Sequence, residues 1–69
     1  MQTDIDKDCY SIAEFCHRHS ISRTHYFLIR ADGLGPREIR IGGKVLISRE
    51  AAETWRRERE HETAATNAA

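Results

Sequence analysis

The fold is decided by residues 11–35, which read SIAEFCHRHSISRTHYFLIRADGLG. Ser11, followed three residues later by Glu14, forms a capping box, a pattern that satisfies unpaired backbone N–H groups where a helix begins. The side chains that then recur at the spacing of one helix face are Ile12, Phe15, Cys16 and His19. The pattern predicts a short first helix with one inward face.

A second helix is predicted after a short turn. Ser22 is placed to cap its start, and Ile21 turns inward from the turn itself. The apolar stripe consists of Tyr26 and Ile29, with Phe27 or Leu28 as a further member. Gly33 suits the left-handed position just past a helix end, and Gly35-Pro36 prevents a restart. Two helices joined by a turn that holds a core residue predict a helix-turn-helix.

A hairpin and a third helix complete the expected fold. The alternating apolar residues of the two strands are Ile39, Ile41, Val45 and Ile47. Gly42-Gly43 between them accepts the positive φ angles of a two-residue turn. Ser48 caps a last helix whose inward face holds Ala51, Ala52 and Trp55, and we expect Trp55 in the core. We therefore expect a mostly α fold with a small β-hairpin, a winged helix-turn-helix in the order α-α-β-β-α.

The chain of 69 residues is long enough for a single small core. We expect a mobile acidic leader at 1–9, a winged helix-turn-helix DNA-binding domain at 10–60 and a disordered or frayed tail at 61–69. No apolar run approaches the roughly 18 residues of a membrane span, and no signal peptide is recognisable. Because two cysteines suit a reducing compartment, the expected location is the bacterial cytoplasm, on the nucleoid.

The formal net charge of zero conceals a polarised sequence. Residues 1–14 carry a net charge of −3, residues 15–49 carry +5 and residues 50–69 carry −2. The basic excess therefore lies in the segment with the second helix and the hairpin, and a local field of that sign attracts a polyanion. The alternative is an ordinary charged surface in which one segment happens to be basic.

Five stretches resemble the small phage and plasmid regulators of the AlpA/excisionase type, in the MerR-like winged-helix group. They are YSIAEFC (10–16), ISRT (21–24), GPR (35–37), IGGKVLIS (41–48) and EAAETWRR (50–57). The resemblance covers about residues 10–58. It implies DNA binding, with the second helix in the major groove and the hairpin as the wing. It does not separate transcription control from assistance in site-specific recombination.

Three positions depart from the family's usual pattern. Ser20 stands in the turn where a Gly is usual, which predicts modest strain if the backbone there is left-handed. The wing tip reads Gly42-Gly43-Lys44, so one of its two usual basic residues is missing. His19 stands where a Leu is common, which predicts a first helix that is less tightly packed.

The expected DNA contacts fall into two groups. The candidates on the recognition helix are Ser22, Arg23, Thr24, His25, Phe27 and Arg30. The candidates on the wing are Arg37, Arg40, Gly43 and Lys44. Arg23 is the best candidate for a bidentate contact with guanine, the alternative being a solvated arginine. Phe27 is either a core residue or a contact with sugar or a thymine methyl group, and Arg30 either contacts phosphate or is solvated.

These features predict a transcriptional regulator of a prophage, a plasmid or another mobile element. One alternative is an excisionase-like recombination directionality factor that bends DNA. Another is a protein-interaction or inhibitor module without DNA binding, which would use Phe27, Leu28 and Leu46 as its contact surface. The expected partner is double-stranded DNA. Self-association or cooperative binding on DNA stays open, and neither a membrane nor a small-molecule ligand is expected.

Catalysis and metal binding find little support in the sequence. The Cys and His residues that lie close together are Cys9, Cys16, His17 and His19. Their spacing matches no common zinc pattern, and Cys16 fits a buried apolar thiol on the inward face. No third group is evident to orient a Cys–His pair, and a domain this small offers no deep pocket. We therefore expect no catalytic residue, no metal and no cofactor, and we expect the protein not to be an enzyme.

Overall fold

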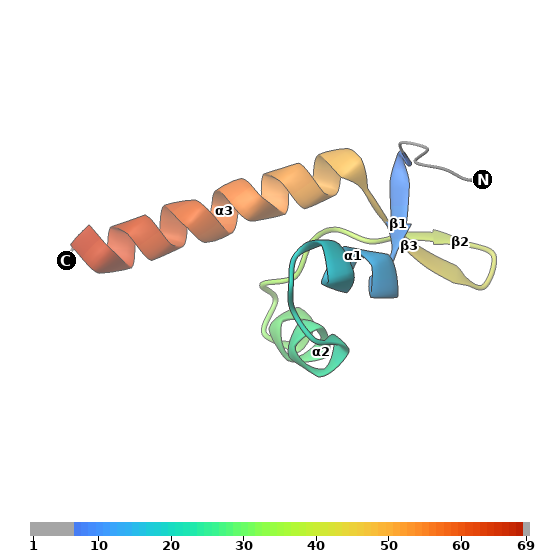
Figure 1. Cartoon of the computed structure of the whole chain (residues 1–69), viewed down its shortest axis with the longest axis horizontal. Coiled ribbons are helices and arrows are strands. Elements are labelled where there is room, and N and C mark those ends of the chain that lie inside the picture. Colours follow the sequence, from blue (N-terminus) through green and yellow to red (C-terminus); the bar gives the residue numbers. More distant parts are fainter. Residues whose placement is uncertain (1–6, 69) are drawn as a thin grey trace.

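The computed structural model describes residues 7–68 as three helices and one three-stranded antiparallel sheet (Figure 1). In chain order the elements are β1 (Cys9–Ser11), α1 (Ile12–Arg18), α2 (Arg23–Ala31), β2 (Ile39–Ile41), β3 (Lys44–Ser48) and α3 (Arg49–Ala68). The three helices and the hairpin begin where the sequence predicts them, although α3 extends further than expected. The third strand, β1, was not predicted.

β1 joins the far edge of the hairpin, so the sheet order is β1-β3-β2. Cys9 pairs with Ser48 and Tyr10 with Ile47, and both of these central side chains, Tyr10 and Ile47, are buried. Cys9, which the sequence analysis assigned to the mobile leader, therefore belongs to the sheet. Lys7 and Asp8 of the expected leader are described as well, whereas residues 1–6 lie outside the described residues.

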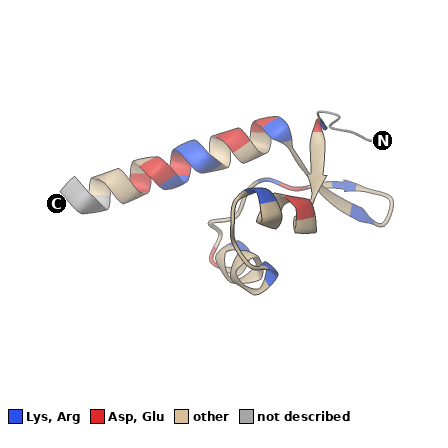
Figure 2. Cartoon of the chain, in the orientation of Figure 1, with Lys and Arg blue, Asp and Glu red and all other residues tan. Residues whose placement is uncertain are grey.

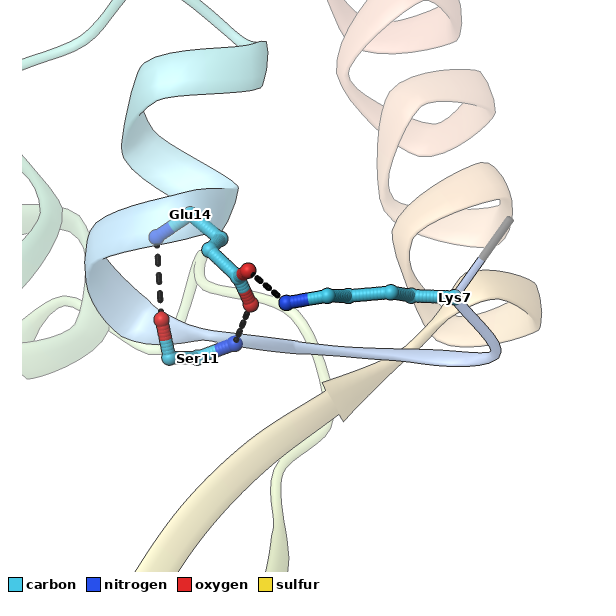
Figure 3. A network of polar contacts seen from close by, with 3 residues as sticks. All are labelled: Lys7, Ser11 and Glu14. Carbon is cyan, nitrogen blue, oxygen red and sulfur yellow. Dashed lines mark hydrogen bonds and ion pairs between the residues drawn. The ribbon is translucent and has the colours of Figure 1, made fainter. Parts of the chain in front are cut away.

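α1 begins with the predicted capping box (Figure 3). The Ser11 hydroxyl accepts a hydrogen bond of 3.1 Å from the backbone N–H of Glu14, and the backbone N–H of Ser11 donates one of 2.9 Å to Glu14 Oε1. Lys7 forms an ion pair with Glu14 Oε2. The hydrogen bond from Lys7 and the backbone N–H of Ser11 lower the pKa of Glu14 below its usual range. The chain before β1 is thereby anchored to the first turn of α1.

α1 and α2 both end in a Schellman motif, in which two backbone N–H groups fold back onto the last turn of the helix. In α1, Ser20 N–H donates to His17 O (3.3 Å) and Ile21 N–H to Cys16 O (3.0 Å). The residue in the left-handed position is Ser20, with a φ of 58°. At the end of α2 the left-handed residue is Gly33, with a φ of 76°, as the sequence predicts. The backbone at Ser20 is thus the left-handed one in which Gly is favoured.

The core is small and aromatic. Its buried members are Tyr10, Phe15, Cys16, Tyr26, Ile47 and Ala52. The Phe15 ring meets Tyr26 and Trp55 edge-on, at centroid distances of 5.7 and 5.1 Å. Trp55, expected in the core, is half-buried at its border, because its indole N–H reaches out to donate a hydrogen bond of 2.7 Å to Leu34 O.

His19 continues the aromatic cluster. Its ring stacks on Phe15 at 4.2 Å, and its Nδ1 lies 2.7 Å from Phe15 O. Its Nε2 lies 3.1 Å from the guanidinium of Arg56 on α3. A leucine would pack on Phe15 but could make neither polar contact, so His19 links the end of α1 to the third helix.

α3 begins at the predicted cap, where the Ser48 hydroxyl accepts a hydrogen bond of 3.0 Å from the N–H of Ala51. The helix packs on the core through its first turns and then projects away from the compact body (Figure 1). It runs to Ala68, through most of the segment where we expected a disordered or frayed tail. Residues 56–65 are rich in the strong helix formers Ala, Arg and Glu, and Arg59 forms an ion pair with Glu62 at 3.0 Å. Residue 69 of that tail lies outside the described residues.

No helix among the described residues is long and apolar enough to cross a membrane.

Candidate functional site

The first turn of α2 presents its side chains to solvent. The Ser22 hydroxyl accepts a hydrogen bond of 3.0 Å from the N–H of His25, which fixes the start of the helix. Ser22, Arg23, Thr24 and His25 are all exposed, and the turn contains no acidic residue. Four of the predicted site residues therefore lie together on an open, basic helix end.

The rest of α2 divides into a core face and an outward face. Tyr26 is completely buried, which orients the helix. Thr24, Leu28 and Ala31, which lie three or four residues apart, form the opposite row and are all exposed. Phe27 borders this row with 42% of its surface exposed, so it is not the core residue that one interpretation of the sequence made it.

Arg30 is held by an internal ion pair. Its Nη2 lies 3.1 Å from Glu38 Oε1, and its guanidinium covers the Phe27 ring at 5.7 Å from the centroid. Glu38 Oε2 accepts a hydrogen bond of 2.6 Å from the Tyr26 hydroxyl. The charge of Arg30, which we expected to be solvated or on phosphate, is therefore largely neutralised within the chain.

Glu38 is the site residue that the sequence analysis missed. Burial, together with the hydrogen bond to the Glu38 carboxylate, raises the pKa of Tyr26 well above its usual range. A buried tyrosine needs a partner for its hydroxyl, and this requirement is the one sequence signal that could have indicated a nearby acid. The only acids between α2 and β2 are Asp32 and Glu38.

Arg37, on the connection from α2 to β2, and Arg40, on β2, border different hollows of the surface. Arg37 lines a groove of about 660 Å³ between this connection and α3, together with Glu50, Glu58 and Trp55. Arg40 lines an adjoining, more open hollow with Arg30 and Glu38, and Glu38 also borders the first groove. Of the two arginines predicted to hold the wing on DNA, Arg37 borders the groove next to α3 and Arg40 does not.

The hairpin of β2 and β3 is basic and its tip is a two-glycine turn. Arg40 pairs with Val45 and Ile41 with Lys44, so Gly42 and Gly43 form the whole connection. Gly42 has a φ of 60° whereas Gly43 is not left-handed, the pattern of a type II′ turn. Residues 39–48 include two basic residues and no acid, and Figure 2 accordingly shows blue but no red on this hairpin.

Most of these basic groups have no acidic partner. Within residues 7–65, ion pairs join Lys7 to Glu14, Arg30 to Glu38, Arg49 to Asp8 and Arg59 to Glu62. Arg23, Arg40 and Lys44 take part in none of them, and all three are exposed. The start of α2 and the hairpin therefore offer uncompensated positive charge.

The Cys and His residues do not gather into a site in the described part of the chain. Cys16 is only 3% exposed, and burial raises the pKa of its thiol, as expected for a buried apolar thiol. His17 is exposed and His19 lies in the aromatic cluster. Among the described residues no group of three or more His, Cys, Asp or Glu side chains is arranged to hold a metal ion.

Comparison with known proteins yields no relative: no family model matches the sequence, and neither the curated proteins nor the solved structures give a match. The resemblance to AlpA/excisionase-type regulators therefore stays a prediction from the motifs.

Proposed function

We propose that this chain is a sequence-specific, double-stranded DNA-binding protein of the winged helix-turn-helix type. α2 would enter the major groove, and the hairpin of β2 and β3 would lie on the backbone or in the minor groove. The observation that carries the proposal is the exposed, unpaired positive charge of Arg23, Arg40 and Lys44 on two elements without a competing acid. Such charge attracts phosphate, whereas base edges supply the specificity.

Roles follow from the positions of the side chains. Arg23, on the first turn of α2, is placed to reach a base edge, and a bidentate contact with guanine is worth about 1–3 kcal/mol of discrimination. Thr24 and His25 flank it, and the N–H groups of that turn favour phosphate. Arg40 and Lys44 hold the hairpin on the backbone, with Gly43 at the tip allowing close approach. Arg37, on the α3 side of its connection, contributes less.

The biological role that fits best is transcription regulation of a mobile element, carried out in the cytoplasm. One recognition helix gives an interface of only about 600–1,000 Å², so useful specificity calls for a dimer, tandem sites or a partner. An excisionase-like factor would use tandem sites and bend them, which a circular-permutation mobility assay detects. We propose a binding protein and not an enzyme; the thiol of Cys16 is buried and is not accessible as a nucleophile.

A protein-interaction module is the second candidate, because Leu28 and Ile41 are largely exposed on α2 and β2. It predicts a protein complex that survives physiological salt and no affinity for DNA. The charge-reversal test below separates it from the first candidate.

The proposal is tested by fluorescence anisotropy with labelled duplex DNA from the region upstream of the gene and with a scrambled duplex. If about five phosphates are contacted, the slope of log affinity against log salt is near −4 to −5, so affinity falls several hundredfold from about 50 to 200 mM salt. Reversing Arg23, Arg40 and Lys44 to Glu should abolish binding. As a matched pair of single reversals, Arg23→Glu should weaken binding strongly, whereas Arg57→Glu on α3 makes the same change of charge at another exposed arginine and should cost little. Equal binding by both variants would reject the proposed surface.

The role of Arg23 has its own test. Arg23→Ala should lose both affinity and sequence preference, whereas Arg37→Ala should retain the preference for the specific duplex. Unchanged affinity and preference in Arg23→Ala would exclude it as a base-reading residue.

A further inference from the structure

The centre of the outward face of α2 is apolar. Leu28 is 61% exposed, more than any other large hydrophobic residue described, and it lies one turn after Thr24 and one before Ala31. Phe27 borders the same row. A leucine this open at the centre of a proposed binding face has no role in the core, and an exposed apolar patch of this kind marks a contact surface.

We propose that Leu28, assisted by Thr24 and Phe27, recognises the 5-methyl groups of thymine in the major groove. The inference rests on the proposed function and specifies which bases α2 reads beyond the Arg23 contact. Of the base edges in the major groove, the thymine methyl is the one apolar group, and Ala, Thr and Phe side chains are known to contact it. Leucine can form no hydrogen bond with a base and gains only by covering such a group.

Leu28 and Phe27 differ in how firmly they are held. The Phe27 ring packs edge-on against Tyr26 at 5.4 Å and lies beneath the guanidinium of Arg30. These contacts hold the Phe27 ring in place beside the row, whereas Leu28 is the more exposed of the two side chains. Thr24 and Leu28 are four residues apart and lie on one row, and Phe27 borders that row, so the methyl-reading side chains share one side of the helix, with Arg23 at its start.

The charges around this face favour DNA over other occupants. Arg23 lies at the start of α2, and the hairpin adds Arg40 and Lys44, none of them in an ion pair among the described residues. A second copy docked here by two-fold symmetry would bring this same basic surface against itself. A DNA duplex supplies both the phosphates that these cations need and the methyl groups that Leu28 can cover.

The test compares thymine with deoxyuridine, which lacks the 5-methyl group and pairs in the same way. A duplex is first selected from a random-sequence pool by the wild-type protein, and binding is then measured by anisotropy on that duplex and on its copy with deoxyuridine at every thymine. Wild type should lose about fourfold in affinity for each methyl group that it covers. Leu28→Ala should bind the thymine duplex more weakly and should lose most of this difference.

The matched control is Leu34→Ala, which removes another exposed leucine, one that lies outside α2. It should keep the full difference between the two duplexes, and circular dichroism should show that both variants are folded. Equal wild-type affinity for the two duplexes, or an undiminished deoxyuridine penalty in Leu28→Ala, overturns the inference while leaving the proposed function intact. Failure to bind any duplex overturns both.

Discussion

The hydroxyl of Tyr26 donates a hydrogen bond of 2.6 Å to Oε2 of Glu38, while the other carboxylate oxygen of Glu38 holds Arg30 at 3.1 Å. A single carboxylate thus ties the buried ring of α2 to the connection that leads into β2. The two elements of the proposed DNA surface are linked through this one side chain.

Removing the Tyr26 hydroxyl should measure that link. Tyr26→Phe keeps the buried ring and loses a hydrogen bond to a charged group, for which we expect a cost of about 1.5–3 kcal/mol in the free energy of unfolding. Urea denaturation measures it. In a Glu38→Gln background the same change should cost clearly less, because the partner has lost its charge. Equal costs in both backgrounds would show that the charge of Glu38 adds nothing to the hydrogen bond.

The same pair predicts a loss of stability at high pH. Burial and the hydrogen bond to Glu38 raise the pKa of Tyr26 above its ordinary value of 10.0. The folded chain therefore keeps a proton that the unfolded chain releases above that value, so the free energy of unfolding falls as pH rises past 10. Urea titrations between about pH 9 and 11 should show this decline in wild type. In Tyr26→Phe the free energy of unfolding should fall less steeply with pH. An equally steep fall in the variant would show that other groups cause it.

The Schellman motifs of α1 and α2 provide a matched pair of backbone tests. A non-glycine residue in the left-handed region costs about 1–2 kcal/mol, partly offset in the exchange because glycine gains about 0.4–1 kcal/mol of freedom when unfolded. Ser20→Gly should therefore stabilise the chain by about 0.5–1 kcal/mol.

Gly33→Ser should lower stability by a similar amount. A Cβ at Gly33 would meet no atom within 4 Å, so its cost is conformational and not steric. Thermal unfolding of both variants gives the comparison. Ser20→Ala serves as the control and should leave stability nearly unchanged, since it keeps the strain. A destabilised Ser20→Gly would show that the serine has a role beyond its backbone.

The turn of the hairpin should accept a basic residue at one glycine and reject it at the other. Gly43 is not left-handed, and a Cβ there would meet no atom within 4 Å. Gly43→Lys should therefore preserve stability and, if the hairpin lies on phosphates, steepen the salt dependence of DNA affinity by about one unit of slope. Gly42→Lys adds the same charge at a φ of 60° and should destabilise the hairpin. Thermal unfolding and anisotropy at several salt concentrations separate the two effects. No change in slope for a stable Gly43→Lys would place the tip away from the backbone.

Local sequence signals predicted much of the fold because the features they report are local. Ser11, Ser22 and Ser48 all accept the capping hydrogen bonds expected of them, and Gly33 has the expected left-handed backbone. β1 escaped prediction because three residues are too short for a periodic pattern and their partner lies far along the chain. The continuation of α3 was missed because its last turns carry no apolar stripe and depend on helix propensity alone.

The sequence predicted which side chains of the candidate site are exposed, but it did not predict which of them form ion pairs or line the groove. The first turn of α2 is as open as its polar sequence indicates. Two features depend on how the connection after α2 runs, which no periodicity encodes: Arg30 is neutralised by Glu38, and Arg37 borders the groove next to α3.

β1 also bears on the order in which the domain can form. Tyr10 leaves the ribosome among the first described residues, yet its partner in the sheet is Ile47, and Ala52 of the same core follows later still. During synthesis Tyr10 therefore stays exposed to solvent until the hairpin and the first turns of α3 have been made. Because such distant pairings form late, we expect α1 and α2 to associate first and docking of β1 to complete the core.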